Sequence, residues 1–554
     1  MNHESIKCMG WYIVKYICLN VALLLLFAAV LVNSPYIPVG MMDYQNWWIA
    51  RFSIVFAVSC IVVLLLSKNK QQAVRAFHYG VVANLILIGG IEAVWGLRQL
   101  FGLASSNHSL FALTGSFYNP GPYSGYLAMI FPLCVGEFLT LGKLEKRNKA
   151  DQFKYYFIFA IGVLILCTLP AGMSRSAWIA ALVSGLWVYG MHHSWGTRLS
   201  QWIKQHRKLA VVSAMVAVIL LIAGGTALFQ MKADSASGRL LMWKVSSMAI
   251  AKKPFAGYGN DRFTQGYGEA QEKYFAEGDY SPTEELVAGS PEYAFNEYLN
   301  IAVEFGLPVL IVGLLLIAFS LWKGITDKRI SACGGILSFL IFAFSSYPMH
   351  IPGFTYAFVF LVAACIIGRS WVALLVFAVM VGLSGTYRWK YNRYDACREW
   401  MNTRVLYNTN AVEAAKKDYA RLYPALKDRG AFLFEYGHCL HKLKEYDAST
   451  LILTEAMIFT CDPMVLNVIG KNYHAKGEYT EAEKWLIRST HRLPGRIYPY
   501  YLLAKLYAEP EFLQLDKLKQ AIGTVLTKEP KVQSTAIRQM REEVKKLIKI
   551  DGNE

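Results

Sequence analysis

Two arginines and one histidine stand at the ends of apolar segments of this sequence, where charged side chains can reach a substrate. Arg175 opens one apolar segment, and Arg239 follows a Ser-Gly turn at the start of a helical stretch. Guanidinium groups stay charged and form paired hydrogen bonds to phosphate or carboxylate oxygens, so both arginines could bind and stabilise an anionic group. Histidine side chains ordinarily change charge near neutral pH, so His350, between two prolines, could act as a general acid or base. These three are the predicted catalytic residues.

Four further polar residues are predicted to bind substrate together with the two arginines. Asn119 lies in a Gly/Pro/aromatic loop over 114–123, and Arg262 follows a Gly-rich turn. Asn296 and Glu304 share one face of a helix predicted over 291–306, and a polar face on a helix that enters a bilayer should line a cavity.

Each of these charged side chains also has a purely structural interpretation. An arginine at a membrane surface can extend to the lipid headgroups, and a basic outer loop can simply attract anionic lipid. His350 can be a turn residue held by backbone hydrogen bonds, since its two prolines already explain the bend. Glu304 can be a hydrogen-bonding carboxylate.

The elements that would position these residues are membrane-spanning helices. Of 554 residues, 55% are hydrophobic and 17% are charged, and the mean hydropathy is +0.30, which leaves too little polar surface for a soluble protein. A span needs roughly 20 apolar residues, and about eleven such runs precede residue 388. They cover residues 11–32, 47–66, 79–100, 122–141, 154–170, 176–190, 209–229, 300–322, 332–347, 351–368 and 370–387.

The basic residues predict the orientation of these spans. Lys and Arg gather in alternate short loops, which places those loops and the N-terminus in the cytoplasm. The first run lacks a cleavage site and is predicted to be a retained span. The opposite, outer side then receives the loop over 101–121, the turns at Arg175 and His350, and a long loop over 230–293. This distribution explains the net charge of +17 without nucleic acid.

The ten cysteines form no framework and no Cys/His metal grouping. We therefore expect no metal and no cofactor.

The polar C-terminal segment, 388–554, has an internal period. Gly437, Gly470 and Ala504 recur at intervals of roughly 34 residues, as paired helices in tetratricopeptide repeats do. We predict an all-α protein with a transmembrane domain over 1–387 and a periplasmic, tetratricopeptide-like domain over 388–554. Such arrays bind protein partners; an unrelated helical domain is the alternative.

Four motifs in this order resemble the O-antigen ligase superfamily over residues 80–370. They are the Asn-Pro loop at Asn119, Ser-Arg at Arg175, Arg-x-x-x-Trp from Arg239 with a following Pro-x-x-Gly-x-Gly, and Asn-Glu-Tyr-Leu from Asn296 with a following Glu-x-Gly. The resemblance implies a glycosyltransferase of the bacterial inner membrane that takes a glycan from undecaprenyl pyrophosphate on the periplasmic face, without a metal. Phe295 departs from the family, which has a proposed catalytic histidine there. His350 is predicted to be the substitute base, and Glu304 and Glu292 are further candidates for this role.

The superfamily leaves several acceptors open. An O-antigen ligase transfers the glycan to lipid A-core, a Wzy-type polymerase to another lipid-linked glycan, and a protein O-oligosaccharyltransferase to a Ser or Thr hydroxyl. We expect the ligase reaction first. The alternative of another class is a non-enzymatic membrane scaffold or transporter subunit that displays the repeat domain.

Overall fold

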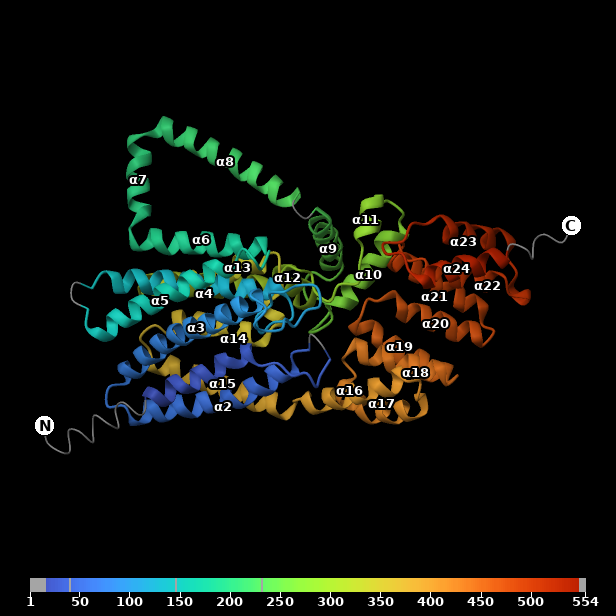
Figure 1. The fold of residues 1–554 in the computed structure, drawn as a ribbon, viewed down its shortest axis with the longest axis horizontal. Helices are drawn as coiled ribbons and strands as arrows, with labels where there is room; N and C mark the ends of the chain where they lie inside the picture. Colours follow the sequence, from blue (N-terminus) through green and yellow to red (C-terminus); the bar gives the residue numbers. More distant parts are fainter. Residues whose placement is uncertain (1–15, 39–40, 145–146, 231–232, 548–554) are drawn as a thin grey trace. The chain divides into compact units, whose positions relative to one another are not determined.

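The computed structural model describes residues 16–38, 41–144, 147–230 and 233–547, and every regular element in these ranges is helical (Figure 1). This confirms the all-α prediction for the described residues. The chain divides into two compact units. The first unit comprises Met1–Leu228 and Ile311–Asp395, and the second comprises Phe229–Leu310 and Ala396–Glu554.

The helices of the first unit follow the predicted apolar runs. After an apolar helix over Tyr16–Leu31 come α2 (Asp43–Leu66), α3 (Lys70–Leu100), α4 (Pro120–Gly142), α5 (Lys149–Thr168), α6 (Arg175–His192), α7 (Trp195–Gln205), most of α8 (Arg207–Gln230), the end of α12 (Glu297–Thr326), α13 (Ile330–Ala343), the short η2 (Pro348–His350), α14 (Pro352–Ile367) and α15 (Trp371–Lys390). Among the described residues, 6 helices are long and apolar enough to cross a membrane. The chain is a multi-pass membrane protein, and the count of about eleven spans stays a prediction.

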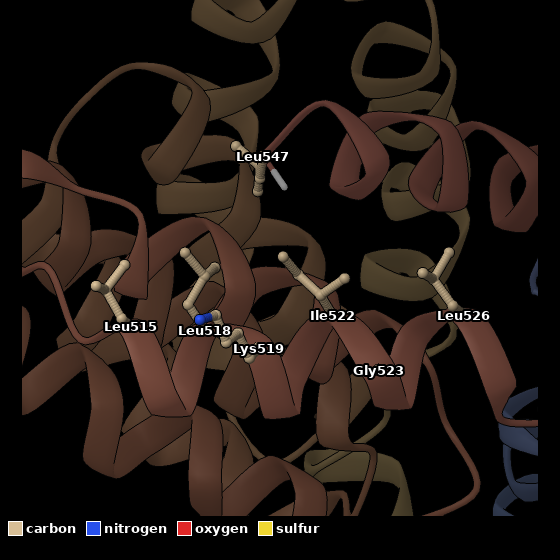
Figure 2. Close-up of a pocket in the computed structure, with 7 residues that line it drawn as sticks. All are labelled: Leu515, Leu518, Lys519, Ile522, Gly523, Leu526 and Leu547. Carbon is tan, nitrogen blue, oxygen red and sulfur yellow. The ribbon is translucent and has the colours of Figure 1, made fainter. Parts of the chain in front are cut away.

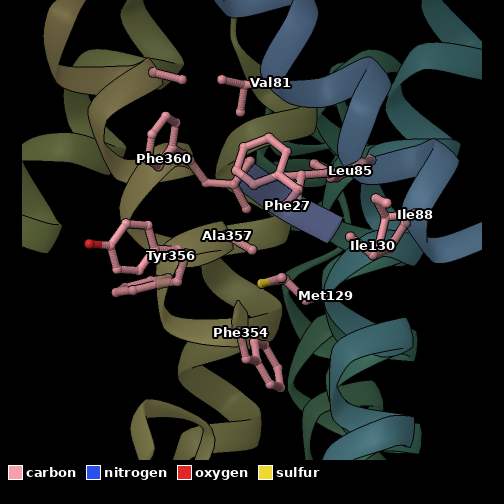
Figure 3. Close-up of a cluster of buried hydrophobic side chains, with 14 of the residues drawn as sticks. Phe27, Val81, Leu85, Ile88, Met129, Ile130, Phe354, Tyr356, Ala357 and Phe360 are labelled. Carbon is pink, nitrogen blue, oxygen red and sulfur yellow. The ribbon is translucent and has the colours of Figure 1, made fainter. Parts of the chain in front are cut away.

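Aromatic and aliphatic side chains fill the centre of the first unit. Phe27, Phe354 and Phe360 meet Leu85 and Met129 in one buried cluster, which joins α3, α4, α14 and the first apolar helix (Figure 3). Helices α2 and α15 lie side by side although they are far apart in the sequence (Figure 1). This cluster therefore holds together helices from distant parts of the chain.

The second unit combines the long predicted loop with the polar C-terminal helices. The loop forms α9 (Ala233–Lys252), α10 (Phe263–Ala276), α11 (Pro282–Val287) and the start of α12. The C-terminal helices are α16 (Tyr394–Asn408), α17 (Val412–Leu426), α18 (Gly430–Lys442), α19 (Tyr446–Phe459), α20 (Pro463–Ala475), α21 (Tyr479–Arg492), α22 (Tyr498–Tyr507), η3 (Pro510–Phe512), α23 (Leu515–Thr527) and α24 (Thr535–Leu547).

Three successive helix pairs pack where the period predicts them: α18 with α19, α20 with α21, and α22 with α23. Gly437 lies against Leu453 and Gly470 against Leu486, so a small residue lets each of these pairs approach closely. The pairs are a structural finding, while their assignment as tetratricopeptide repeats stays a prediction.

Helix α10 is fastened to these pairs by a partly buried ion-pair cluster. Glu272 accepts hydrogen bonds from Arg488 Nε and Arg492 Nη2, both at 2.7 Å, and Arg492 is 3% exposed. Burial alone would raise the pKa of Glu272, but the two guanidinium groups outweigh it and hold that pKa below its ordinary value.

Glu272→Gln is expected to destabilise the packing of α10 on α21 by about 2–4 kcal/mol, because it leaves the buried Arg492 cation without its counter-charge. Faster hydrogen–deuterium exchange in α10 and α21 would measure this, and Glu269→Gln, whose partner is the exposed Lys252, is the control. Since the pKa of Glu272 is lowered in the folded state, its contribution is present above the unfolded pKa of about 4.3 and is lost as the pH falls below it. Equal exchange in the two variants would contradict the expectation.

Candidate functional site

Asn119 and His350 lie at the same end of the first unit. Helix α4 is antiparallel to α13, because Gly125 near the start of α4 touches Phe342 near the end of α13. Asn119 caps the start of α4, where its Oδ1 accepts a hydrogen bond from Gly121 N at 3.0 Å. His350 ends the short helix η2 that follows α13 and contacts it. The two predicted residues therefore share one end of the bundle.

Arg175 lies at this end too. It is the first residue of α6, and the turn before α6 lies against the start of α4, since Gly172 touches Ser124. Trp178 Nε1 donates a hydrogen bond to Leu169 O at 2.7 Å and closes the turn. The half-buried Arg175 side chain is thus set at a rigid helix start.

A buried carboxylate that the sequence reasoning missed organises the loop beside these residues. Glu92, in α3, is 0% exposed. Its carboxylate accepts hydrogen bonds from the Ser116 hydroxyl and from Ser116 N, the latter at 3.1 Å. Tyr123 OH donates to the backbone carbonyl oxygen of Glu92 at 3.1 Å. Burying a single carboxylate inside an apolar run costs free energy, so an isolated acid in such a run suggests a specific role. The position of Glu92 in the sequence could therefore have identified it.

Gly115 is required by this arrangement. Its φ is +55°, in the left-handed region that glycine adopts without strain. A Cβ at this position would collide with the Glu92 carboxylate and the Tyr123 ring. Gln99 Oε1 accepts from Gly115 N at 2.7 Å and from Thr114 N at 2.9 Å. The loop that leads to Asn119 is therefore held by buried side chains of α3.

In the second unit, Arg239 on α9 faces Phe295. The Arg239 guanidinium carbon lies 5.7 Å from the centre of the Phe295 ring, within the range of a cation–π contact. Phe295 has a φ of +48°, which is uncommon for a bulky residue. Backbone strain of this kind often marks a functional position, and Phe295 stands where the family resemblance implied a catalytic histidine.

Arg239 and Phe295 line a cavity of about 570 Å³ in the second unit. Lys531, from the segment between α23 and α24, supplies a second cation, and Gly238, Met242 and Val287 contribute to the apolar wall. Two cations on an otherwise largely apolar wall suit an anion that is attached to an apolar chain or a glycan. Lys531 was not predicted, because 292 residues separate it from Arg239.

Asn296, Glu304 and Arg262 belong to the same unit as this cavity, and Asn296 directly follows Phe295 of its lining. Asn296 Oδ1 accepts hydrogen bonds from Tyr298 N at 3.0 Å and Leu299 N at 3.1 Å, so it caps the start of α12. Glu304 Oε1 accepts from Phe263 N at 3.3 Å, at the start of α10. The structure therefore brings Glu304 next to the segment that carries the exposed Arg262.

The helix prediction over 291–306 was wrong at its beginning. Helix α12 begins at Glu297, because the segment from Pro291 to Asn296 contains the left-handed Phe295 and is not helical. Helical geometry breaks again at Gly306, whose φ is +81° and whose missing side chain leaves room for the Phe255 carbonyl. Leu307 N donates to Pro254 O at 2.8 Å and ties the two segments together.

A second cavity, of about 270 Å³, lies between α23 and the end of α24 and has mainly aliphatic walls (Figure 2). Leu515, Leu518, Ile522, Leu526 and Leu547 line it. Its lining offers no carboxylate, imidazole or guanidinium, so it is not the candidate site.

Residues 160–314 match the family model described as O-antigen ligase. This range contains Arg175, Arg239, Arg262, Asn296 and Glu304, whereas Asn119 and His350 lie outside it. The chain is thus a multi-pass membrane protein with a segment, 160–314, that is similar to the O-antigen ligase family. A stretch of 160 residues is 28% identical to the general O-oligosaccharyltransferase of Acinetobacter baylyi and covers 26% of this chain and 27% of that protein.

Proposed function

We propose that the protein transfers a glycan from an undecaprenyl-pyrophosphate donor to an acceptor hydroxyl on the periplasmic side of the inner membrane. The observation that carries the proposal is the cavity lined by Arg239, Phe295 and Lys531, within a unit that contains part of the matched ligase segment. In this proposal the two cations bind the diphosphate of the donor. They stabilise the charge that appears on the diphosphate oxygen as its bond to the sugar C1 breaks.

The acceptor oxygen attacks the same sugar carbon and loses its proton to a base. Phe295 cannot accept a proton, so the proposed base is His350, at the bundle end that also carries Asn119 and Arg175. Arg175 is proposed to bind the diphosphate as well, and Asn119, Arg262, Asn296 and Glu304 are proposed to position the substrates. The diphosphate leaves as an anion, so the step is balanced in charge. The proposal includes neither a metal nor a cofactor.

The acceptor is proposed to be lipid A-core, as in an O-antigen ligase. The similarity to a general O-oligosaccharyltransferase supports a second candidate, a Ser or Thr hydroxyl on a protein. Polymerisation of the glycan on another lipid-linked unit would use the same donor chemistry. The C-terminal helix pairs are proposed to be a periplasmic tetratricopeptide-like domain that binds a protein.

Purified protein in lipid nanodiscs, incubated with lipid-linked glycan and each acceptor class in turn, tests this function. Mass spectrometry should detect the glycan on lipid A-core, and a glycosylated protein or an extended lipid-linked glycan would instead identify one of the other two reactions. His350→Ala should reduce the product by about 10²-fold or more if His350 is the base. Absence of product with every acceptor, together with binding of the donor, would favour the non-enzymatic scaffold.

A further inference from the structure

The first helices of the three C-terminal pairs carry a row of lysines. Lys471 on α20 and Lys505 on α22 each follow the small residue of their helix pair, so they occupy equivalent positions. His438 holds the same position on α18, and Lys442 lies one helical turn beyond it. Helix α20 contacts both α18 and α22. We call Lys442, Lys471 and Lys505 the lysine row.

Several other lysines of the second unit are paired with acids. Lys416, Lys476 and Lys517 all lie within 2.7 Å of a carboxylate oxygen. In the part of the chain that the structure describes, Lys471 and Lys505 have no carboxylate at ion-pair distance. Burial and the neighbouring Lys505 lower the pKa of Lys471. Repulsion between like charges without a counter-ion raises the free energy of the ligand-free surface. Binding of an anionic ligand would lower that free energy.

The opposite side of the helix pairs is already covered by the chain itself. Helix α10 packs on the second helices α19 and α21, where Thr264 donates to Ile458 O at 3.2 Å and Gln271 to Arg492 O at 2.5 Å. The first helices α18, α20 and α22, which carry the lysine row, are therefore the side of the pairs that α10 leaves free.

A buried amide next to the row lacks a hydrogen-bond donor. Asn467 lies one turn before Lys471 on α20 and is 1% exposed. Its Nδ2 lies 3.6 Å from Met464 Sδ, but its Oδ1 has no partner among the described residues. An unsatisfied buried oxygen costs free energy, and an N–H group of a ligand would satisfy it. Met464, one turn earlier, is 36% exposed and adaptable enough to move aside.

The aromatic residues of this side favour a peptide over a sugar. Sugars are commonly held against exposed aromatic faces, but Phe434 stacks on His438 at 6.0 Å and Tyr498 stacks on Tyr501 at 6.2 Å. Tyr501 OH also donates to Glu543 at 2.5 Å. These rings are occupied by neighbours, whereas the lysines and the Asn467 oxygen match the carboxylates and backbone N–H groups of an acidic polypeptide.

We propose that the lysine row, together with Asn467, binds an extended acidic segment of a partner polypeptide. Packed helices lie about 8–10 Å apart, so a row over three helices spans about 20 Å. An extended chain covers that length with about six residues at about 3.3 Å each. Carboxylates of the segment pair with the lysines, and one of its backbone N–H groups donates to Asn467 Oδ1. This proposal does not depend on the proposed glycan transfer.

The test measures binding of a fluorescent ten-residue peptide rich in glutamate to the full-length protein in nanodiscs of neutral phosphatidylcholine. The Lys471→Ala/Lys505→Ala variant should bind about tenfold or more weakly and show a smaller dependence on salt, because two charge-assisted hydrogen bonds are lost. Lys484→Ala is the control, since Lys484 lies on α21 and pairs with Glu481. Lys505→Ala alone changes an exposed residue and should weaken binding even if the double variant is unstable.

Lys471→Glu/Lys505→Glu should lose the glutamate peptide and gain affinity for a lysine-rich one. A matched glutamine peptide should bind no variant. Equal affinity of wild type, Lys505→Ala and the double variant for the glutamate peptide would overturn the proposal. So would an acidic oligosaccharide such as oligogalacturonate that binds more tightly than the peptide and loses affinity in the same variants, because the surface would then recognise a glycan.

Discussion

Arg239→Ala is expected to reduce glycan transfer by about 10²–10³-fold, the loss typical when one group that stabilises a developing anion is removed. Arg239 is half-buried on the wall of the cavity and faces the Phe295 ring, so its guanidinium is fixed before the substrate binds. Arg239→Lys keeps the charge but loses the planar pair of donors, and we expect it to recover only part of the activity. The measurement is the initial rate of product formation with lipid-linked donor in nanodiscs.

The neighbouring cations separate a local effect from a general loss of positive charge. Lys531→Ala should cause a smaller loss than Arg239→Ala, because Lys531 is exposed at the same cavity. Lys252→Ala, on the same helix as Arg239 but paired with Glu269 at 2.7 Å, should leave the rate unchanged. If Arg239→Ala and Lys252→Ala had equal rates, Arg239 would not bind the diphosphate.

Hydropathy and local motifs were sufficient to predict the helices and several helix ends. Asn119 before two prolines is a strong helix-start signal, and it caps α4 as such residues do. Arg175 after a Ser-containing turn likewise begins α6. Pro254 follows the helix that carries Arg239, which ends at Lys252. These features depend on residues that are adjacent in the chain, and a single sequence reports them directly.

Contacts between distant segments could not be predicted in this way. Lys531 joins Arg239 at one cavity because the segment between α23 and α24 lies against α9 and α11, where Lys528 of this segment pairs with Glu285 of α11. No local sequence pattern predicts this contact. The packing of α10, within the predicted long loop, on α21 through Glu272 was likewise not predictable from local sequence. The left-handed backbone conformation of Phe295 could not be predicted either, because phenylalanine rarely adopts a positive φ.

Gly115→Ala is expected to reduce glycan transfer by about 10²-fold, because displacement of a positioning element by about an ångström is enough for such a loss. The alanine Cβ would collide with the Glu92 carboxylate, and its backbone would be strained at a φ of +55°. Strain and overpacking together cost about 2–5 kcal/mol, which the loop can relieve only by leaving the α3 side chains that hold it.

Glu92→Gln distinguishes a positional role of this buried group from a merely stabilising one. Glutamine keeps the shape of the side chain and can still accept from Ser116 N, so the loop should stay in place and transfer should fall by only about tenfold or less. Gly121→Ala, in the first turn of α4 where an added Cβ meets no atom closer than 3.5 Å, is the control for an added methyl group. Thermal stability of each variant in nanodiscs accompanies the rate. If Gly115→Ala transferred glycan as fast as Gly121→Ala, the loop held by Glu92 would not position substrate.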